Sequence, residues 1–424
     1  MLTGKAQEYY RQILVRFPHS YFAEDESKII IGIDPVFLDA SQMDFSEFKA
    51  RFYEKSAKKS LCEYAGYFGV FAADFISLFE NVGVCEKKSY EFPLFLFADA
   101  SAYLIYEKHS KMYHCFGEDK YFEFLDENSL NSAQNSKQNS AKSSSKREFK
   151  IISDAKKEQQ SFETMIKRAK EYLLSGDIFQ VVLSRQLCIQ TNVDSFSFYE
   201  ELSTQNPSPY MFHFPTAYGI VVGSSPELVL SIKNKELFVA PIAGTRNLSA
   251  GCDKEALKKE LLSDEKELCE HRMLVDLARN DVSKFGTNTK VANPFSIVSY
   301  QYVMHIVSEV RANLKDDASI FDAITAVFPA GTLSGAPKIR ALEIINELES
   351  LNRGVYGGAI GFLKFNEDVL LAILIRSLIF VGDKAYIASG AGIVAHSQPE
   401  KEYAEICAKR HSLISAFEGL KDKR

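Results

Sequence analysis

Apolar residues recur along this chain with two periods, and each period predicts a different kind of element. Apolar runs such as Tyr218–Val222 and Leu228–Ile232, on either side of a turn at Gly223–Pro226, predict paired antiparallel strands. Apolar residues three and four apart predict helices, as in Gln159–Ser175. The predicted strands outnumber the helices and do not alternate with them. We therefore predict an α+β fold, a layered sandwich of two large, mainly antiparallel sheets flanked by helices.

A glycine-rich turn runs directly into a predicted helix within Phe328–Leu351. We expect Ser334 or Gly335 to cap this helix and Pro337 to occupy its first position. Free backbone N–H groups at such a helix start, with Lys338 beside them, form a candidate anion site. An ordinary loop and helix start is the alternative, because a single glycine-rich turn does not distinguish the two.

Acidic residues share one face of the predicted long helix Asp253–Asn280. Glu267 and Glu270 are three residues apart and lie on the face that carries the apolar positions. A second pair, Glu402 and Glu405, has the same spacing on the predicted C-terminal helix. Oxygen ligands from two helices, without His or Cys, suit Mg²⁺ held together with an anionic substrate. A partly exposed acidic face without a metal explains the spacing equally well.

Arg376 interrupts the predicted strand Leu370–Phe380, which otherwise reads as buried on both faces. An unpaired buried guanidinium is costly, so we expect it to meet a carboxylate of the protein or of a ligand. A predicted turn at Ser389–Gly392 offers exposed amides for another carboxylate. His305 in a predicted strand and Glu227 in a turn are weaker candidates, because a core histidine and a solvated acid are common.

Composition excludes some classes of function and divides the chain. A net charge of −6 disfavours nucleic-acid binding, and seven scattered cysteines without paired spacing suit a reducing compartment. The longest apolar run, Val369–Val381, is too short to span a bilayer, so we expect a cytoplasmic protein that does not contact membranes. The Ser-, Asn-, Lys- and Gln-rich residues 128–147 predict a flexible insertion between residues 1–127 and 148–424.

Ordered segments between Gln159 and Arg410 resemble the chorismate-utilising enzymes, and within them anthranilate synthase component I. The segments are GDIFQVVLSR, NPSPYMFHF, GSSPE, PIAGTRN, ELCEHRMLVDLARND, YVMHIVSEV, GTLSGAPKIRA, YGGAIGF, IRS and GAGIVAHSQPEKEY. The resemblance implies that residues 148–424 are a chorismate-binding catalytic domain and that residues 1–127 are regulatory. It implies conversion of chorismate and ammonia to anthranilate and pyruvate with Mg²⁺, the first committed step of tryptophan biosynthesis.

The resemblance also implies roles for individual residues. Glu270 and Glu405 would bind the metal, with Glu267 in its neighbourhood. Glu227 would protonate the departing C4 hydroxyl, and His305 would line the ring during pyruvate elimination. The residue that removes the C2 proton stays open. The implied chorismate contacts are Gly244, Thr245, Arg246, Tyr356, Arg376, Gly390, Ala391 and Gly392, of which Thr245 is also a catalytic candidate.

Two positions separate this chain from related activities. Relatives that add water carry a lysine base where this chain has Gln180, and a neutral amide cannot deprotonate water. Relatives that make 4-amino-4-deoxychorismate often carry a nucleophilic lysine where this chain has Ala243. Anthranilate synthase is therefore preferred to aminodeoxychorismate synthase component I. A non-catalytic tryptophan-sensing scaffold of the same fold is the remaining alternative.

Regulation and the ammonia source are further expectations from the resemblance. Tryptophan would bind near Pro209, Tyr210 and Met211, with Asp25 replacing a serine of the inhibitor site, so feedback should be weakened; an alignment through Ser27 is also possible. Glutamine hydrolysis needs a cysteine nucleophile in a strand–turn–helix context that this sequence lacks. We therefore expect a partner glutamine amidotransferase subunit, in a heterodimer or heterotetramer.

Overall fold

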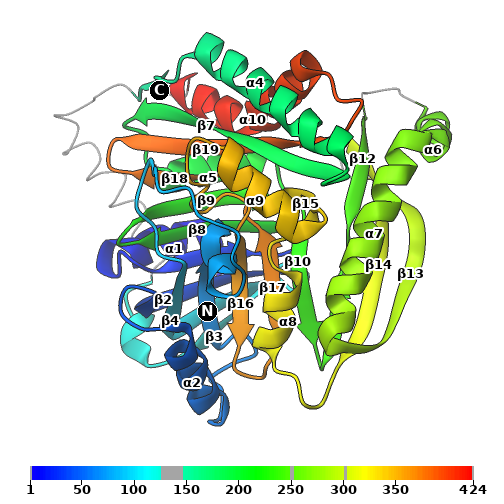
Figure 1. The fold of residues 1–424 in the computed structure, drawn as a ribbon. Helices are drawn as coiled ribbons and strands as arrows, with labels where there is room; N and C mark the ends of the chain where they lie inside the picture. Colours follow the sequence, from blue (N-terminus) through cyan, green and yellow to red (C-terminus); the bar gives the residue numbers. More distant parts are fainter. Residues whose placement is uncertain (1, 126–146, 249–252, 300–302, 423–424) are drawn as a thin grey trace.

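A computed structural model of the chain describes residues 2–125, 147–248, 253–299 and 303–422, and shows a long, bent sheet with helices around it (Figure 1). The strands are β1 (Tyr21–Glu24), β2 (Lys28–Asp39), β3 (Gly66–Phe71), β4 (Phe95–Glu107), β5 (Met112–Phe116), β6 (Phe149–Ile151), β7 (Gln180–Thr191), β8 (Tyr210–Thr216), β9 (Gly219–Ser225), β10 (Leu228–Lys233), β11 (Glu236–Val239), β12 (Ile242–Asn247), β13 (Gly286–Ser299), β14 (Val303–Leu314), β15 (Gly335–Ala336), β16 (Ala359–Lys364), β17 (Val369–Ile373), β18 (Ser377–Val381) and β19 (Lys384–Ile393). The helices are α1 (Ala6–Arg16), α2 (Phe45–Ser56), α4 (Ala155–Ser175), α5 (Ser195–Gln205), α6 (Lys254–Ser263), α7 (Glu265–Phe285), α8 (Ile320–Val327), α9 (Lys338–Leu348) and α10 (Pro399–Asp422), with short 3₁₀ turns η1 (Ala73–Leu78), η2 (Asp119–Tyr121) and η3 (Gly331–Leu333).

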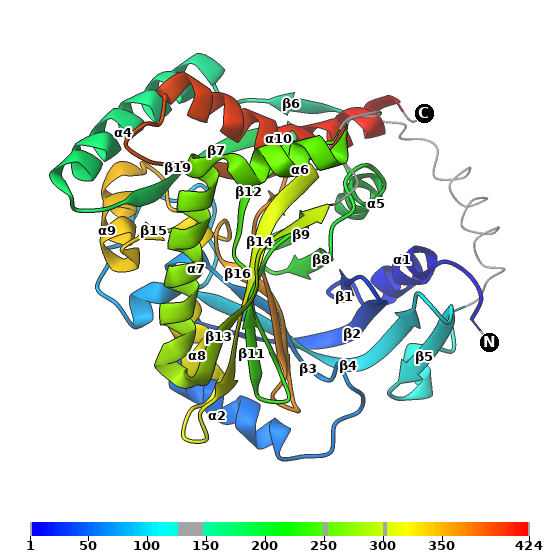
Figure 2. The ribbon, with the colours of Figure 1, turned by 90° about the vertical axis from the view of Figure 1, so that its right-hand side faces the viewer.

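All strand pairings among the described residues are antiparallel, and they join the strands into one continuous sheet. The predicted α+β architecture, antiparallel sheet flanked by helices, is confirmed. The pairings connect the two predicted sheets through the N-terminal strands: β16 pairs with β3, β3 with β4, β4 with β2, β2 with β1, and β1 with β8. The N-terminal strands therefore lie in the middle of the sheet and separate its two halves, as Figure 2 shows.

The halves also differ in their helices. Helix α7 packs on β12, β13 and β14 in one half, whereas α10 packs on β19 and against α5 and α4 in the other (Figure 2). No helix of the described ranges is long and apolar enough to cross a membrane. The predicted insertion 128–147 lies, except for Arg147, outside the described residues.

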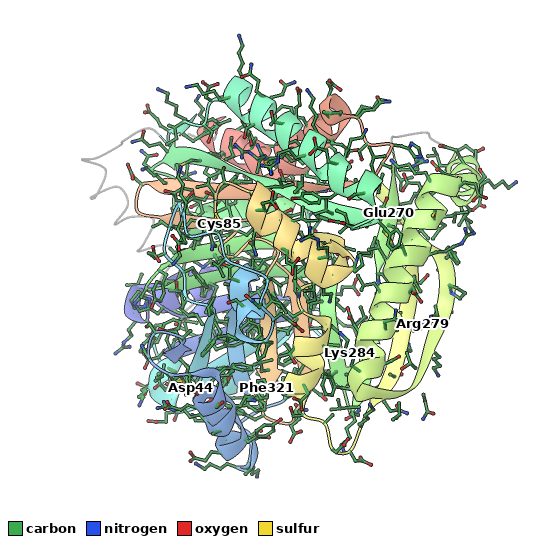
Figure 3. All side chains as sticks on the ribbon, in the orientation of Figure 1. Asp44, Cys85, Glu270, Arg279, Lys284 and Phe321 are labelled. Carbon is green, nitrogen blue, oxygen red and sulfur yellow. The ribbon has the colours of Figure 1, made fainter. Side chains whose placement is uncertain are left out.

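An aromatic core joins the N-terminal region to the rest of the chain. Phe321 of α8, labelled in Figure 3, contacts Phe45, Phe48 and Phe52 of α2, with ring centroids 5.7, 6.1 and 5.2 Å away. Phe48 and Phe52 are fully buried. Burial of such side chains contributes roughly 1.5–3 kcal/mol each, so α2 and α8 stabilise one another.

Five local predictions are wrong. Strands β9 and β10, predicted to pair around Gly223–Pro226, pair instead with β8 and β18 and with β11 and β17. The predicted strand Leu370–Phe380 is divided into β17 and β18. The predicted helix Asp253–Asn280 is two helices, because the Asp264 carboxylate caps α7 by accepting from the N–H groups of Lys266 and Glu267. The predicted turn Ser389–Gly392 is part of strand β19. The cap of α9 is Pro337, without a side-chain hydrogen bond; the Ser334 hydroxyl instead donates to the carbonyl of Ala330.

Candidate active site

Two of the places where the chain crosses between the halves of the sheet carry a candidate site residue. Glu227 lies between β9 and β10, and Arg376 lies between β17 and β18. Backbone hydrogen bonds hold the two crossings together. The N–H of Ile373 donates to the backbone carbonyl of Glu227, and the N–H of Ser224 donates to the backbone carbonyl of Arg376. A turn acid and a strand arginine, 149 positions apart in sequence by subtraction of their numbers, are thereby brought to one region.

Arg376 is a half-buried cation with no ion pair among the described residues. Its guanidinium donates to the backbone carbonyl of Lys409 at 2.7 Å. Burial lowers the pKa of Arg376, which the negative charge of Glu405 and the nearby Tyr356 oppose. The backbone φ is 50°, a left-handed conformation that costs energy in a non-glycine residue and occurs often at functional sites. The internal carboxylate partner considered from the sequence is not found there, which leaves the guanidinium suited to a ligand carboxylate.

Glu227 is a half-buried acid whose carboxyl group is largely removed from water. Burial raises its pKa to about 7, although a hydrogen bond from Thr332 and the charge of Lys409 act in the opposite direction. The Thr332 hydroxyl donates to Glu227 Oε1 at 2.9 Å. Near neutral pH, a large fraction of this side chain therefore carries a proton, as a general acid requires.

Lys409 and Thr332 are polar residues of this region that the sequence reasoning missed. Lys409 Nζ lies 2.7 Å from Glu405 Oε1 and donates to the carbonyl of Gly390 at 2.9 Å. The spacing of four residues after Glu405 on one helix is a signal that could have identified it. Thr332 lies within the glycine-rich turn, and no spacing in the sequence distinguishes it from an ordinary loop threonine.

The Gly390–Gly392 segment lies where β19 has only β7 as a neighbouring strand. Pairing with β18 ends at Ile387, whereas pairing with β7 continues to Ile393. A Cβ atom at Gly390 would lie 2.9 Å from the Tyr356 hydroxyl, and one at Gly392 would lie 2.5 Å from Gln180 Nε2. Glycine at both positions thus lets Tyr356 and Gln180 approach the strand.

Gln180 connects this segment to the acidic face of α7. It is buried, and its Nε2 donates to Glu270 Oε1 at 2.8 Å. Its Oε1 is buried without a hydrogen-bond partner in the described part of the chain. Because Nε2 is held by a carboxylate, the orientation of the amide is fixed and its oxygen remains an unused acceptor.

The four candidate metal-binding acids influence one another. Burial, followed by the charges of Glu267 and Glu405, raises the pKa of Glu270; burial and then Glu405 raise the pKa of Glu402. Within the described ranges, no three acidic, His or Cys side chains are close enough to form a metal site by themselves. Glu270 and Glu405 contact Gln180 and Lys409 instead. An oxygen-only set of mutually repelling carboxylates fits Mg²⁺ that is completed by an anionic ligand. Figure 3 labels Glu270 on α7.

Gly244 forms a bulge in β12 opposite His305. The register shifts between Ala243 and Thr245, and Gly244 has φ 64°. Its carbonyl lies 3.2 Å from His305 Nδ1, and burial lowers the pKa of His305. A neutral His305 that donates through Nδ1 carries its lone pair on Nε2.

Arg246, expected to contact substrate, is surrounded by carboxylates of the protein. Its guanidinium lies 3.1 Å from Glu260, 2.9 Å from Asp264 and 3.5 Å from Glu267. These acids neutralise the cation in this structure. Arg246 therefore joins α6 and α7 to β12, on the side of the candidate metal-binding acids.

Lys338 does not belong to an anion site. It is buried, and its Nζ lies 2.6 Å from Asp281 Oδ2 and donates to the carbonyl of Val327. Gly335, the other part of the predicted site, pairs with Val181 of β7. The glycine-rich turn thus fixes η3 and α9 against β7 and α7, and it contributes Thr332 to the site.

A second cavity, of about 30 Å³, brings together Asp25, Tyr210 and Met211 of the predicted inhibitor site. Pro209 is not among its lining residues. Asp25 Oδ1 accepts hydrogen bonds from the N–H and hydroxyl of Ser27 and from the N–H of Lys28, and Oδ2 accepts from Tyr64 at 3.1 Å. Asp25 and Ser27, which the two alternative alignments place in the inhibitor site, therefore lie in one hydrogen-bonded turn.

Comparison with known proteins agrees with this fold. The model of the family "chorismate binding enzyme" matches residues 9–415. Anthranilate synthase component 1 from Acetivibrio thermocellus is 49% identical over 277 residues, which cover 64% of this chain and 56% of that protein. The protein of the same name from Lactococcus lactis subsp. lactis is 36% identical over 359 residues, covering 82% of this chain and 78% of the other.

Solved structures agree as well. The crystal structure of anthranilate synthase component I from Streptococcus pneumoniae TIGR4 has a TM-score of 0.77 and 32% identity, and the match covers 91% of this chain and 92% of that one. The menaquinone-specific isochorismate synthase of Escherichia coli, at 17% identity and a TM-score of 0.74, shares the fold.

The described residues form an antiparallel α+β sheet. An acid, Glu227, and an arginine, Arg376, lie at crossings between its two halves. The chain belongs to the chorismate binding enzyme family. The matched segments span 56%, 54% and 62% of the relatives from Acetivibrio, Neisseria meningitidis and Thermococcus kodakarensis.

Proposed function

We propose that this chain is the aminating subunit of an anthranilate synthase, which converts chorismate and ammonia to anthranilate and pyruvate in the cytoplasm. The observation that carries the proposal is an acid of raised pKa, Glu227, combined with a neutral amide at Gln180 beside Glu270. The acid supplies a proton to a leaving hydroxyl. The amide cannot deprotonate water, whereas ammonia is nucleophilic without deprotonation.

The first step forms the C2–N bond and breaks the C4–O bond. Arg376 and Tyr356 bind a substrate carboxylate, and Glu227 donates its proton to the C4 hydroxyl, which leaves as water with the electron pair of the bond. The new C2 ammonium then loses a proton to solvent. The product of this step is an amino-deoxyisochorismate.

The second step eliminates pyruvate and restores aromaticity. A base removes the C2 proton as the bond between the ring and the enolpyruvyl oxygen breaks. His305, with its lone pair on Nε2, is a suitable candidate. Thr245 of β12 lies opposite His305 in the strand register and is a further catalytic candidate.

Glu270 and Glu405, with Glu267 and Glu402 nearby, would hold Mg²⁺. The metal would supply charge neutralisation for the substrate carboxylates. The backbone at Gly244, Gly390, Ala391 and Gly392 would border the substrate, and its N–H groups would orient the ring.

Ammonia would come from a glutamine amidotransferase subunit. The reactive cysteine of such a subunit requires a lowered pKa, whereas burial raises the pKa of both Cys62 and Cys115. Neither thiol therefore suits a nucleophile. We infer a heteromeric enzyme in which this chain uses ammonium alone, and glutamine only with its partner.

Tryptophan would regulate the enzyme from the second cavity, with Asp25, Tyr210 and Met211 at its wall and Pro209 adjoining. An ammonium group must compete there with the donors that already occupy Asp25. Feedback inhibition should therefore be weak.

The test is incubation of the purified chain with chorismate, Mg²⁺ and ammonium, followed by anthranilate fluorescence and product chromatography. Anthranilate and pyruvate in equal amounts are expected. Aminodeoxychorismate would identify the sibling activity, and a flat trace from folded protein that binds Mg²⁺ would indicate a non-catalytic tryptophan-sensing scaffold. Glutamine-dependent product from this chain alone would contradict the proposed partner.

A further inference from the structure

A small cavity is lined by Glu227 and Thr332 of the candidate active site and by residues of α7 and the neighbouring strands. Its volume is about 30 Å³. The lining residues are Glu227, Leu228, Val229, Val239, Ala240, Pro241, Leu274, Leu277, Ala278, Asp281, Val327, Ala330, Gly331 and Thr332. A water molecule needs roughly 10–15 Å³ measured in this way, so the cavity has room for about two.

The wall of this cavity is mainly apolar but carries polar groups at Glu227, Thr332 and Asp281. Leu274, Leu277, Ala278 and Asp281 follow one another at three, one and three positions along α7, so one face of that helix borders the cavity. The Thr332 hydroxyl donates to Glu227 Oε1. Two carboxyl groups, one at the reaction site and one on α7, thus border a single water-sized space.

Asp281 joins the cavity lining to an exposed lysine. It is 5% exposed, and its Oδ1 lies 3.2 Å from Lys284 Nζ. The side chain of Lys284, labelled in Figure 3, is 58% exposed. The other carboxylate oxygen of Asp281 is fixed by Lys338 at 2.6 Å. Asp281 is therefore held in place between the cavity and the surface.

The proposed reaction requires such a connection. Each turnover transfers the proton of Glu227 to the C4 hydroxyl and leaves a buried carboxylate, while the proton lost from the new ammonium goes to solvent. Solvent must therefore return one proton to Glu227 per cycle.

We propose that water molecules in this cavity carry a proton from solvent, past Asp281, to Glu227 after each turnover. The inference depends on the proposed function, because it assigns the reloading of its general acid. Asp281 is a positioning residue: its carboxylate accepts hydrogen bonds from the water and orients it toward Glu227. Hopping along oriented water moves a proton without moving a side chain.

The first test fills the cavity with Ala278→Leu. The matched control is Asn280→Leu, an exposed position on the same helix outside the cavity lining. Rapid-quench measurements near neutral pH with excess chorismate and ammonium should show a burst of about one product per protonated active site in Ala278→Leu. A steady rate about tenfold below wild type should follow, since only acid reloading is slowed.

The control should show neither the burst nor the slower rate. A wild-type steady rate in folded Ala278→Leu would overturn the inference. Ala240→Val fills the same space from the opposite wall and replaces Ala278→Leu if that variant does not fold. Wild-type anthranilate formation is measured first, so failure of the proposed function is recognised separately.

The second test is a high-resolution crystal structure of the wild-type chain. Ordered water between Glu227 and Asp281 is expected. A dry cavity would overturn the inference whatever the variants do, and would make this space a packing gap.

Discussion

The candidate active site and the second cavity differ in how fully their charged side chains are paired. In the active site, Arg376 has no carboxylate partner among the described residues, and the half-buried carboxyl of Glu227 accepts a hydrogen bond from one hydroxyl. In the second cavity, Asp25 already accepts four hydrogen bonds. Unsatisfied buried charge is costly and persists where a ligand completes it, whereas a saturated carboxylate gains little from a ligand. The first region is built to depend on its ligand, and the second is stable without one.

The largest effect should come from the metal-binding acids. Glu270→Gln or Glu405→Gln should lower turnover at least about a thousandfold, because a divalent cation contributes several kcal/mol of charge stabilisation. Anthranilate formation is measured across a Mg²⁺ titration. Glu265→Gln and Glu400→Gln, at exposed positions of the same helices, are the controls. Wild-type rates in the first pair at limiting Mg²⁺ would refute the assignment.

The next effect concerns the general acid. Glu227→Gln should lower kcat by about 10²–10⁴-fold, because an amide cannot donate the proton that the leaving hydroxyl needs. In the wild type, activity per free ammonia should fall as pH rises through the Glu227 pKa of about 7, since the acidic form is lost. Thr332 and Lys409 are the groups that face this carboxyl. A rate that stays constant from acidic to alkaline pH would place the acid elsewhere.

Replacement of the neutral amide should change the product distribution. Gln180→Lys should lower anthranilate output about tenfold and admit some water addition, because an amine beside Glu270 supplies a base. Chromatography of the products from chorismate measures both effects. Gln190→Lys, an exposed position on the same strand, is the control. An unchanged product profile at an unchanged rate would separate Gln180 from the ring.

The smallest effect should appear in the second cavity. Wild-type protein should respond weakly to tryptophan, and Asp25→Ser should lower the inhibitory concentration about tenfold, equivalent to about 1.4 kcal/mol. Inhibition curves at fixed chorismate measure the shift, and Glu26→Ser, at an exposed neighbouring position, is the control. Strong inhibition of the wild type would remove the contrast between the two regions.

The sequence by itself determined the kind of fold and most of the chemistry. Alternating strands around turns predicted an antiparallel α+β sheet, because a pleated strand exposes alternate residues to the core whatever its partner is. Spacing along single helices identified Glu267, Glu270, Glu402 and Glu405, because helical period is a local property. Arg376 was found because a cation within an apolar strand is costly wherever that strand lies.

Only the tertiary structure decided how these residues combine. Sequence spacing cannot show that Glu227 and Arg376 both lie at crossings between halves of the sheet, because strand pairing joins segments far apart in the chain. It also could not show that Lys338 pairs with Asp281, that Ser389–Gly392 forms a strand, or that Asp264 ends one helix and begins another. Each depends on which partner is within a few ångströms, and that distance is set by packing of the whole sheet.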